Sequence, residues 1–186
     1  MKGVLVAVVE YLLGFFALAV FASYAFAAGA PTDERWIAAF KLGGSLALVE
    51  LAVLLFRQAP ANRLILAANL WLVIAAGAAF LEQWWVLLLY QKFGEASLFA
   101  AMLTVGVTAM LVSPSGFVAA TGKRRDVLLA SGVLALAVAA ALGAAVVFRG
   151  DVKLAAIAPV IALAWLNRGL RSAVHRGASQ EAATHA

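Results

Sequence analysis

The chain has 186 residues, of which 66% are hydrophobic and only 12% are charged. Soluble proteins carry about 25% charged residues, so this composition excludes an ordinary water-soluble fold. Because a helix needs about 20 apolar residues to cross a bilayer, the chain can supply several spans joined by short polar loops. We therefore expect an all-α integral membrane protein, a bundle of about six transmembrane helices.

Charge and residue usage also exclude several function classes. The net charge of +5 does not indicate nucleic-acid binding, because the basic residues lie in small groups at the ends of apolar segments. The chain has no cysteine, and its only histidines, His175 and His185, lie in the polar tail. The sequence therefore predicts no cofactor, no metal site and no intramembrane histidine chemistry.

Six apolar segments are expected, covering about residues 4–28, 36–56, 64–90, 96–120, 127–148 and 154–166. The third exceeds the length that a core of about 30 Å requires, so it must tilt or bend near Glu82 and Gln83. Pro114 should kink the fourth. We expect one transmembrane domain over residues 1–170 and a partly disordered cytoplasmic tail over residues 171–186.

The first segment is expected to be a span rather than a cleaved signal sequence, because it is longer than the usual apolar core of about 7–15 residues. Orientation follows from the basic residues, which are enriched on the cytoplasmic side of membrane proteins. Placing both termini in the cytoplasm (N-in/C-in) puts nine of the fourteen basic residues on that side, namely Lys2, Arg57, Arg63, Lys123, Arg124, Arg125, Arg168, Arg171 and Arg176. The expected location is a bacterial inner membrane.

Polar groups inside the apolar segments are the main functional signal, because burying a charge in a bilayer costs roughly 3 kcal/mol or more. Glu10 and Glu50 each lie seven residues inward from an expected cytoplasmic boundary, at Gly3 and Arg57. At about 1.5 Å per residue, both carboxylates are expected about 10 Å from the same membrane face. Three other residues are expected near this depth and would complete a polar layer: Asn69, Ser113 and Ser115.

Two interpretations of this layer remain open. Two acids in one low-dielectric layer can share an exchangeable proton, which would suit a proton- or cation-coupled site. Alternatively, each acid is a hydrogen-bonded packing group between neighbouring helices. Close helix approach is expected under both interpretations, because small residues share the faces of the two acids: Gly14, Ala17, Gly43 and Ala47.

Two further sets of polar residues are candidates. Ser97, Thr104, Thr108 and Ser115 fall on one helical stripe that would line a water path, although such hydroxyls also bond to their own helix. Pro114 would free a carbonyl group at the same level. Near the opposite membrane face, an ion pair is expected between Lys41 and Glu82.

The leading functional hypothesis is a channel or transporter for protons or a small cation or solute, with Glu10, Glu50 and Asn69 at its site. The alternative is a non-catalytic assembly or scaffold protein that binds other transmembrane proteins, or a second copy of itself, through small-residue helix faces. The Ala- and Val-rich segment over residues 130–147 would suit such contacts. An enzyme is disfavoured, because no nucleophile and base pair can be recognised.

Overall fold

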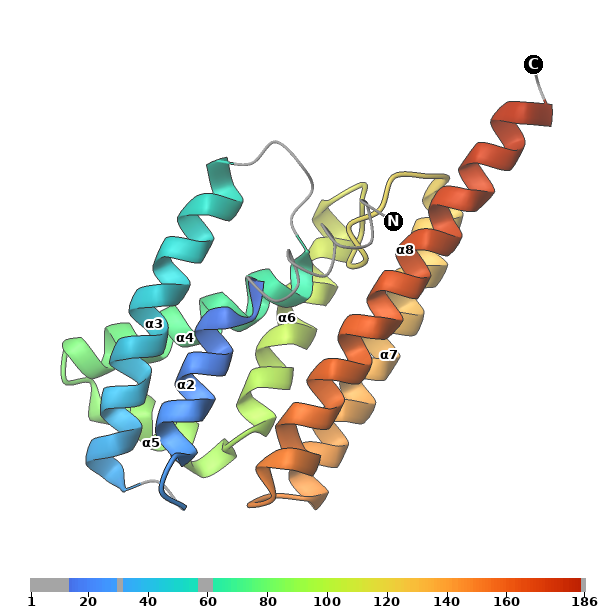
Figure 1. Cartoon of the computed structure of the whole chain (residues 1–186). Helices are drawn as coiled ribbons and strands as arrows, with labels where there is room; N and C mark the ends of the chain where they lie inside the picture. Colours follow the sequence, from blue (N-terminus) through green and yellow to red (C-terminus); the bar gives the residue numbers. More distant parts are fainter. Residues whose placement is uncertain (1–13, 30–31, 57–61, 185–186) are drawn as a thin grey trace. The chain divides into compact units, whose positions relative to one another are not determined.

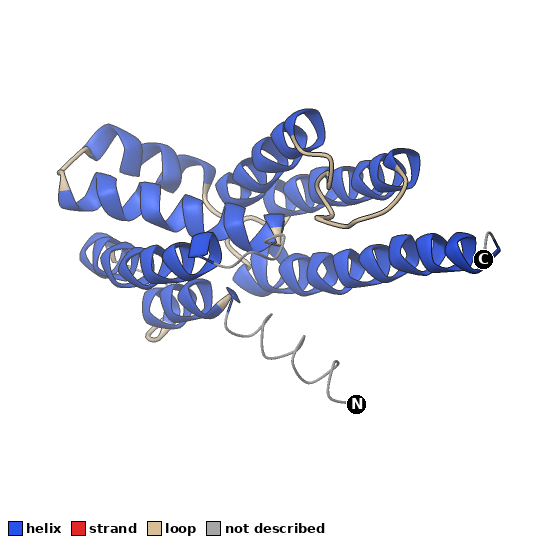
Figure 2. Cartoon of the chain, turned by 90° about the horizontal axis from the view of Figure 1, so that it is seen from above, coloured by secondary structure: helices blue, strands red, loops and turns tan. Residues whose placement is uncertain are grey.

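The computed structural model describes residues 14–29, 32–56 and 62–184. Every regular element in these ranges is a helix, and no strand occurs in them (Figure 1, Figure 2). This agrees with the expected all-helical class, which follows from the long apolar segments: a helix satisfies its own backbone hydrogen bonds and needs no partner strand.

The chain divides into two compact units, which we describe one at a time. The first unit comprises Met1–Gln58 and Ile65–Lys92, and the second comprises Ala59–Leu64 and Phe93–Ala186. The described helices of the first unit are α2 (Phe16–Phe26), α3 (Asp33–Phe56), α4 (Arg63–Phe80) and α5 (Trp84–Phe93). The first two residues of α4 and the last residue of α5 belong to the second unit. Within the first unit, α2 and α3 run side by side in opposite directions (Figure 1).

An aromatic cluster joins the four described helices of the first unit. The Phe21 ring of α2 stacks on Phe40 of α3 with centroids 4.7 Å apart, and Phe40 lies 5.6 Å from Trp71 of α4. Tyr90 of α5 lies 5.3 Å from Trp71 and donates its hydroxyl hydrogen to the Trp71 carbonyl oxygen at 3.1 Å. These contacts bury large apolar surfaces, and the Tyr90 hydroxyl finds its hydrogen-bond acceptor within the cluster.

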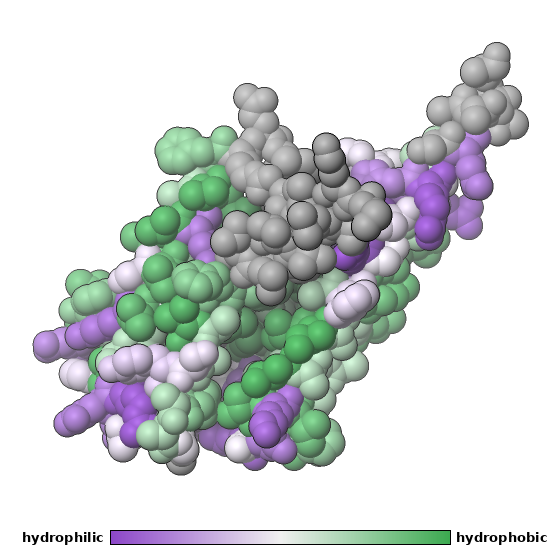
Figure 3. Space-filling view, in the orientation of Figure 1, coloured by the Kyte–Doolittle hydropathy of each residue, from purple (hydrophilic) through white to green (hydrophobic). Residues whose placement is uncertain are grey.

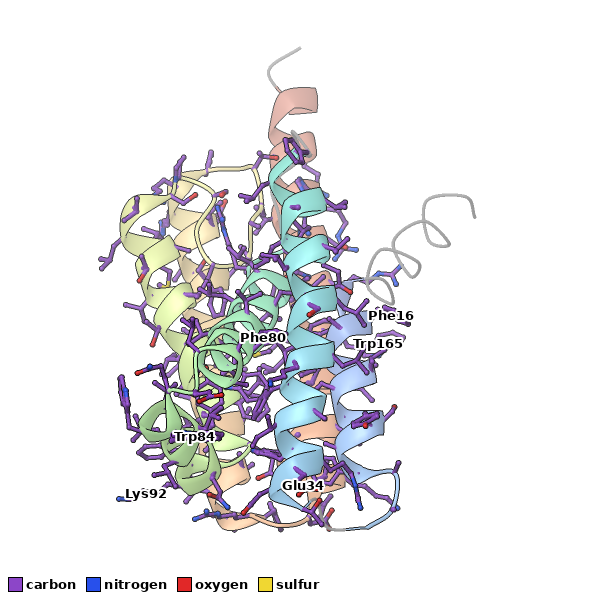
Figure 4. All side chains as sticks on the ribbon, turned by 90° about the vertical axis from the view of Figure 1, so that its left-hand side faces the viewer. Phe16, Glu34, Phe80, Trp84, Lys92 and Trp165 are labelled. Atoms are coloured by element: carbon purple, nitrogen blue, oxygen red, sulfur yellow. The ribbon has the colours of Figure 1, made fainter. Side chains whose placement is uncertain are left out.

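The expected bend in the third apolar segment is a complete break between α4 and α5. Glu82 adopts a left-handed backbone conformation with φ of 55°, and the Gln83 amide donates to the Ala78 carbonyl oxygen at 2.8 Å. This amide-to-carbonyl pattern closes a helix end around a left-handed residue. In Figure 4, Trp84 and Lys92 of the following helix α5 extend outward, as residues at a membrane interface do.

The second unit contains α6 (Ala96–Val112), α7 (Arg124–Val147), the short π-helix η1 (Lys153–Ile157) and α8 (Ala158–Thr184). Helices α7 and α8 lie side by side and run in opposite directions (Figure 1). Pro159 lies two residues after the end of η1 and has no amide hydrogen, which accounts for a widened turn at this point. The last helix is longer than the expected segment of residues 154–166 and continues to Thr184.

Pro114 ends α6 rather than kinking it, so the expected fourth segment stops at Val112 and not near residue 120. The chain from Ser113 to Ala120 is irregular, yet Phe117 and Val118 are completely buried. The hydroxyl oxygen of Ser131 in α7 accepts the amide hydrogens of these two residues, at 2.9 Å and 3.4 Å. A buried serine thus satisfies backbone groups that the missing helix turns would have paired.

Four helices in the described part are long and apolar enough to cross a membrane: Asp33–Phe56, Arg63–Phe80, Arg124–Val147 and Lys153–Ala178. If α5 and α6 form one broken span, the number is five. Hydrophobic side chains cover much of the face seen in Figure 3, and hydrophilic ones line the C-terminal part of α8. Such exposed apolar surface on long helices is typical of a membrane-spanning protein.

Candidate functional site

Glu50 connects three helices of the first unit. It lies in α3 and is partly buried. Its Oε1 atom accepts the backbone N–H of Ala17 in α2 at 3.0 Å, and its Oε2 atom accepts the side-chain amide of Asn69 in α4 at 2.8 Å. The structure therefore brings two residues of the expected polar layer, Glu50 and Asn69, into direct contact.

The Ala17 amide is a partner that the sequence did not predict. The helix α2 begins at Phe16, after Phe15 adopts a non-helical backbone conformation with φ of −107° and ψ of 10°. Amides in the first turn of a helix have no acceptor within that helix, and the helix dipole favours negative charge there. A carboxylate from α3 thus acts as the cap of α2, which stabilises both groups.

Asn69 carries the acceptor that remains open at this site. Its side chain is fully buried, its Nδ2 atom donates to Glu50, and within the described residues its Oδ1 atom has no hydrogen-bond partner. A buried polar atom without a partner is uncommon, because its desolvation costs about 1–3 kcal/mol. Together, Glu50 and Asn69 form a part-buried pair with spare acceptor capacity.

Two adjacent glycines of α3 set the distance between the helices that carry this pair. A Cβ atom at Gly43 would lie 2.8 Å from the Cβ of Phe21 in α2. A Cβ atom at Gly44 would lie 2.7 Å from the Leu72 carbonyl oxygen in α4 and closer still to Ala76. Only glycine permits this approach on both sides, and the approach brings the Glu50 side chain within reach of α2 and α4.

Glu10, the other expected acid of the layer, lies outside the described residues, and its role stays a prediction. Ser113 and Ser115 belong to the second unit, where their hydroxyl oxygens are 2.9 Å apart. The structure thus describes the expected layer as a Glu50 and Asn69 pair in one unit and a serine pair in the other.

Pro114 lies between these serines, and Arg124 completes the helix end that it creates. Because Pro114 has no N–H, the carbonyl oxygen of Met110 lacks its usual helical partner. The Arg124 guanidinium takes that place, donating to the Met110 oxygen at 2.9 Å and also to the carbonyl oxygens of Ser113 at 2.8 Å and Pro114 at 3.1 Å. The freed carbonyl that Pro114 was expected to produce is therefore occupied by an arginine.

The hydroxyl groups of the expected stripe on α6 bond to nearby backbone. Thr104 donates to the Ala100 carbonyl oxygen and Thr108 to the Thr104 carbonyl oxygen, each at 2.8 Å, and both side chains are exposed. Ser97 donates to the Gly94 carbonyl oxygen at 2.7 Å. Ser115 lies beyond the end of α6, so the stripe covers fewer turns than the expected helix would have given it.

Lys41 has a partner other than the expected one. Its ammonium group lies 5.2 Å from the centroid of the Phe80 ring, a cation–π contact. Glu82 is exposed, and in the part of the chain that the structure describes it forms no ion pair with Lys41. The break at Glu82 is consistent with this. The expected ion pair assumed that Glu82 lies in a continuous helix, and a left-handed backbone conformation turns its side chain away from that position.

Among residues 14–29, 32–56 and 62–184, no group of three or more His, Cys, Asp or Glu side chains comes together that could hold a metal ion. No protein-family model, curated protein or solved structure matches the chain. The Glu50 and Asn69 pair and the polar groups at the end of α6 are therefore the candidate functional sites of the described residues.

Proposed function

We propose that the protein is a small polytopic transporter or channel for protons or a small cation, with Glu50 and Asn69 at its exchange site. We further propose a bundle of six spans with both termini in the cytoplasm, and a bacterial inner membrane as its location. Glu50 lies six residues from the end of α3 at Phe56, which places it about 9 Å inside the span. Ionisable groups at such depth commonly belong to ion or proton pathways.

The observation that carries the proposal is the open Oδ1 atom of Asn69 beside the Glu50 carboxylate. When Glu50 is ionised, the Asn69 amide nitrogen donates to it. When Glu50 binds a proton, rotation of the Asn69 carboxamide by about 180° lets Oδ1 accept the new O–H group. The rotation breaks no other hydrogen bond of Oδ1, so the pair suits both protonation states.

A small cation is accommodated by the same geometry. Carboxylate and amide oxygens are the ligands that hard cations prefer, and both types are present at this pair. Each Glu50 oxygen accepts one hydrogen bond from a described residue and retains further acceptor capacity. The Ala17 amide limits the negative charge that the site offers, which favours a proton or a monovalent cation over a divalent one.

The test is a flux measurement on the purified protein in liposomes, comparing the wild type with Glu50→Gln between pH 5 and pH 8. Glutamine can keep both contacts, with its oxygen accepting from Ala17 and its amide donating to a rotated Asn69. It cannot exchange a proton. We expect Glu50→Gln to fold normally and to lose proton or cation flux almost entirely.

Glu34→Gln is the matched control, because Glu34 lies exposed in the first turn of the same helix (Figure 4) and should leave flux unchanged. Retained flux in a folded Glu50→Gln variant would refute the proposal. So would an absence of flux above that of empty liposomes in the wild type.

The second candidate function is an assembly protein that binds other transmembrane helices. Gly132 and Gly143 of α7 favour it, because they lie on one helix face three turns apart and a Cβ atom at either would contact nothing within 4 Å. A partner helix could approach closely there. This function would be supported if the protein co-purified with a stoichiometric membrane partner and showed no flux alone.

A further inference from the structure

Two side chains at the start of α4, in the second unit, have hydrogen-bond donors to spare. Asn62 is only 8% exposed, and its Oδ1 atom accepts the Leu64 amide at 3.0 Å and the Asn167 side-chain amide at 3.1 Å. Because Oδ1 is engaged twice, the carboxamide cannot rotate. Its buried Nδ2 atom is therefore a fixed donor, and within the described residues it has no acceptor.

Arg63 is the next residue, and it also has a hydrogen-bond donor without an acceptor. Its Nε atom is buried without a partner in the described part of the chain, while its Nη2 atom donates weakly to the Ser113 hydroxyl oxygen at 3.4 Å. Ser113 also accepts from the Arg124 guanidinium through its carbonyl oxygen. Two guanidinium groups thus meet at one residue, and the described residues supply no carboxylate that pairs with either.

Like charges that approach each other without a counterion repel, and a desolvated donor without an acceptor is destabilising. An anion would relieve both costs. The serine pair adds hydroxyl groups that can donate to it, since the Ser113 and Ser115 oxygens are 2.9 Å apart and only one of them can donate to the other. Phosphate suits this donor set, because guanidinium groups bind its oxygens with two parallel hydrogen bonds.

We propose that Asn62, Arg63 and the Ser113 to Ser115 turn bind the phosphate group of an anionic membrane lipid. The site lies where α4 begins and where α6 ends, and helix ends in a membrane protein meet the headgroup region. Leu111 and Val112, directly before the turn, are 79% and 80% exposed. An acyl chain can cover these two side chains while the phosphate contacts the polar groups beside them.

Arg124 is a positioning residue in this site. Its guanidinium is engaged by three backbone carbonyl oxygens, which hold the turn in place and keep the positive charge near Ser113. Direct contact with the lipid is assigned to Arg63 and Asn62, whose donors are open. The inference is independent of transport through the first unit, because it concerns only residues of the second.

The experiment measures lipid binding to the purified full chain by native mass spectrometry and by thermal unfolding in neutral detergent. The probes are phosphatidylglycerol, phosphatidylcholine and inorganic phosphate. We expect phosphatidylglycerol to bind and to raise the unfolding temperature, and Arg63→Gln to weaken its binding about tenfold, the equivalent of one lost charged contact. Arg125→Gln, an exposed neighbour of Arg124, is the control and should change binding less than about twofold.

Asn62→Asp keeps the acceptor oxygen for Leu64 and Asn167 but replaces the open donor with negative charge. We expect this variant to fold, to be more stable than the wild type without lipid, and to lose phosphatidylglycerol binding. Equal losses in Arg63→Gln and Arg125→Gln would overturn the proposal, as would equal binding of phosphatidylcholine. Stabilisation by inorganic phosphate but not by the lipid would show a soluble ligand instead and would overturn the lipid assignment.

Discussion

The two units hold their buried polar groups in opposite ways. In the first unit, Glu50 and Asn69 lie within helices and offer more acceptors than the described donors use. In the second unit, Asn62 and Arg63 lie at a helix start and offer more donors than the described acceptors use. An acceptor excess suits a proton or a cation, whereas a donor excess suits an anion, so composition alone would not have distinguished the two sites.

The two units also end their broken helices differently. Helix α4 closes within its own chain segment, around the left-handed Glu82. Helix α6 ends at Pro114, which removes a donor, and it depends on Arg124 from the next helix to replace that donor. The end of α4 therefore depends on local sequence, whereas the end of α6 depends on a tertiary contact. Mutations should affect these two helix ends differently.

The largest effect is expected from Asn69→Leu, which removes the donor to the Glu50 Oε2 atom. The carboxylate would be left partly buried with one contact fewer, at a cost of about 2 kcal/mol in the free energy of unfolding. The measurement is unfolding of the purified protein in mixed micelles, followed by tryptophan fluorescence. Replacing both partners with leucine should cost less than the sum of the single variants, because no unpaired group remains. Additive losses would show that Glu50 and Asn69 do not act as a pair.

A smaller loss, about 1.5 kcal/mol, is expected from Arg124→Gln, because the carbonyl oxygens at the end of α6 lose a charged donor. The informative comparison is the same change made together with Pro114→Ala. Alanine restores an N–H that can donate to the Met110 oxygen, so the arginine should matter less in that background, by about 1 kcal/mol. The same unfolding measurement applies to all three variants. An identical cost in both backgrounds would mean that Arg124 does not replace the missing proline donor.

The smallest effect is a gain in stability from Glu82→Gly. A left-handed conformation costs a non-glycine residue about 1 kcal/mol, and glycine removes that cost. Glu82→Gln is the control, since it removes the charge and keeps the strained backbone, and it should leave unfolding unchanged. Destabilisation by the glutamine variant would instead support the ion pair with Lys41 that the sequence indicated.

Much of the fold was predictable from local sequence. The helical class followed from composition, and the break near Glu82 followed from a segment too long for a bilayer. The end of α6 was predicted less well. A proline inside an apolar run indicates a kink when the helix resumes its backbone hydrogen bonds beyond the proline. Beyond Pro114 the helix does not resume. The distant Arg124 made a complete stop possible by satisfying the exposed carbonyl groups.

The candidate site was predictable only in part. Depth from the membrane face grouped Glu50 with Asn69, because that distance depends on rise per residue alone. The third partner, the Ala17 amide, could not be found in this way, since every residue but proline has an amide and only a helix start leaves it open. In the sequence, Asn62 and Arg63 lie between two expected apolar segments, and Arg63 indicates only the orientation of the chain. Nothing in the sequence indicates that their donors are buried.

By itself, the sequence determined that this protein consists of apolar helices able to span a membrane, because composition and segment length decide whether backbone and side chains can leave water. Tertiary structure alone decided which polar groups meet. The contact between Glu50 and Ala17 joins residues 33 positions apart, and that between Asn62 and Asn167 joins residues 105 positions apart. Such contacts depend on how each helix is rotated against its neighbours, which no local pattern specifies.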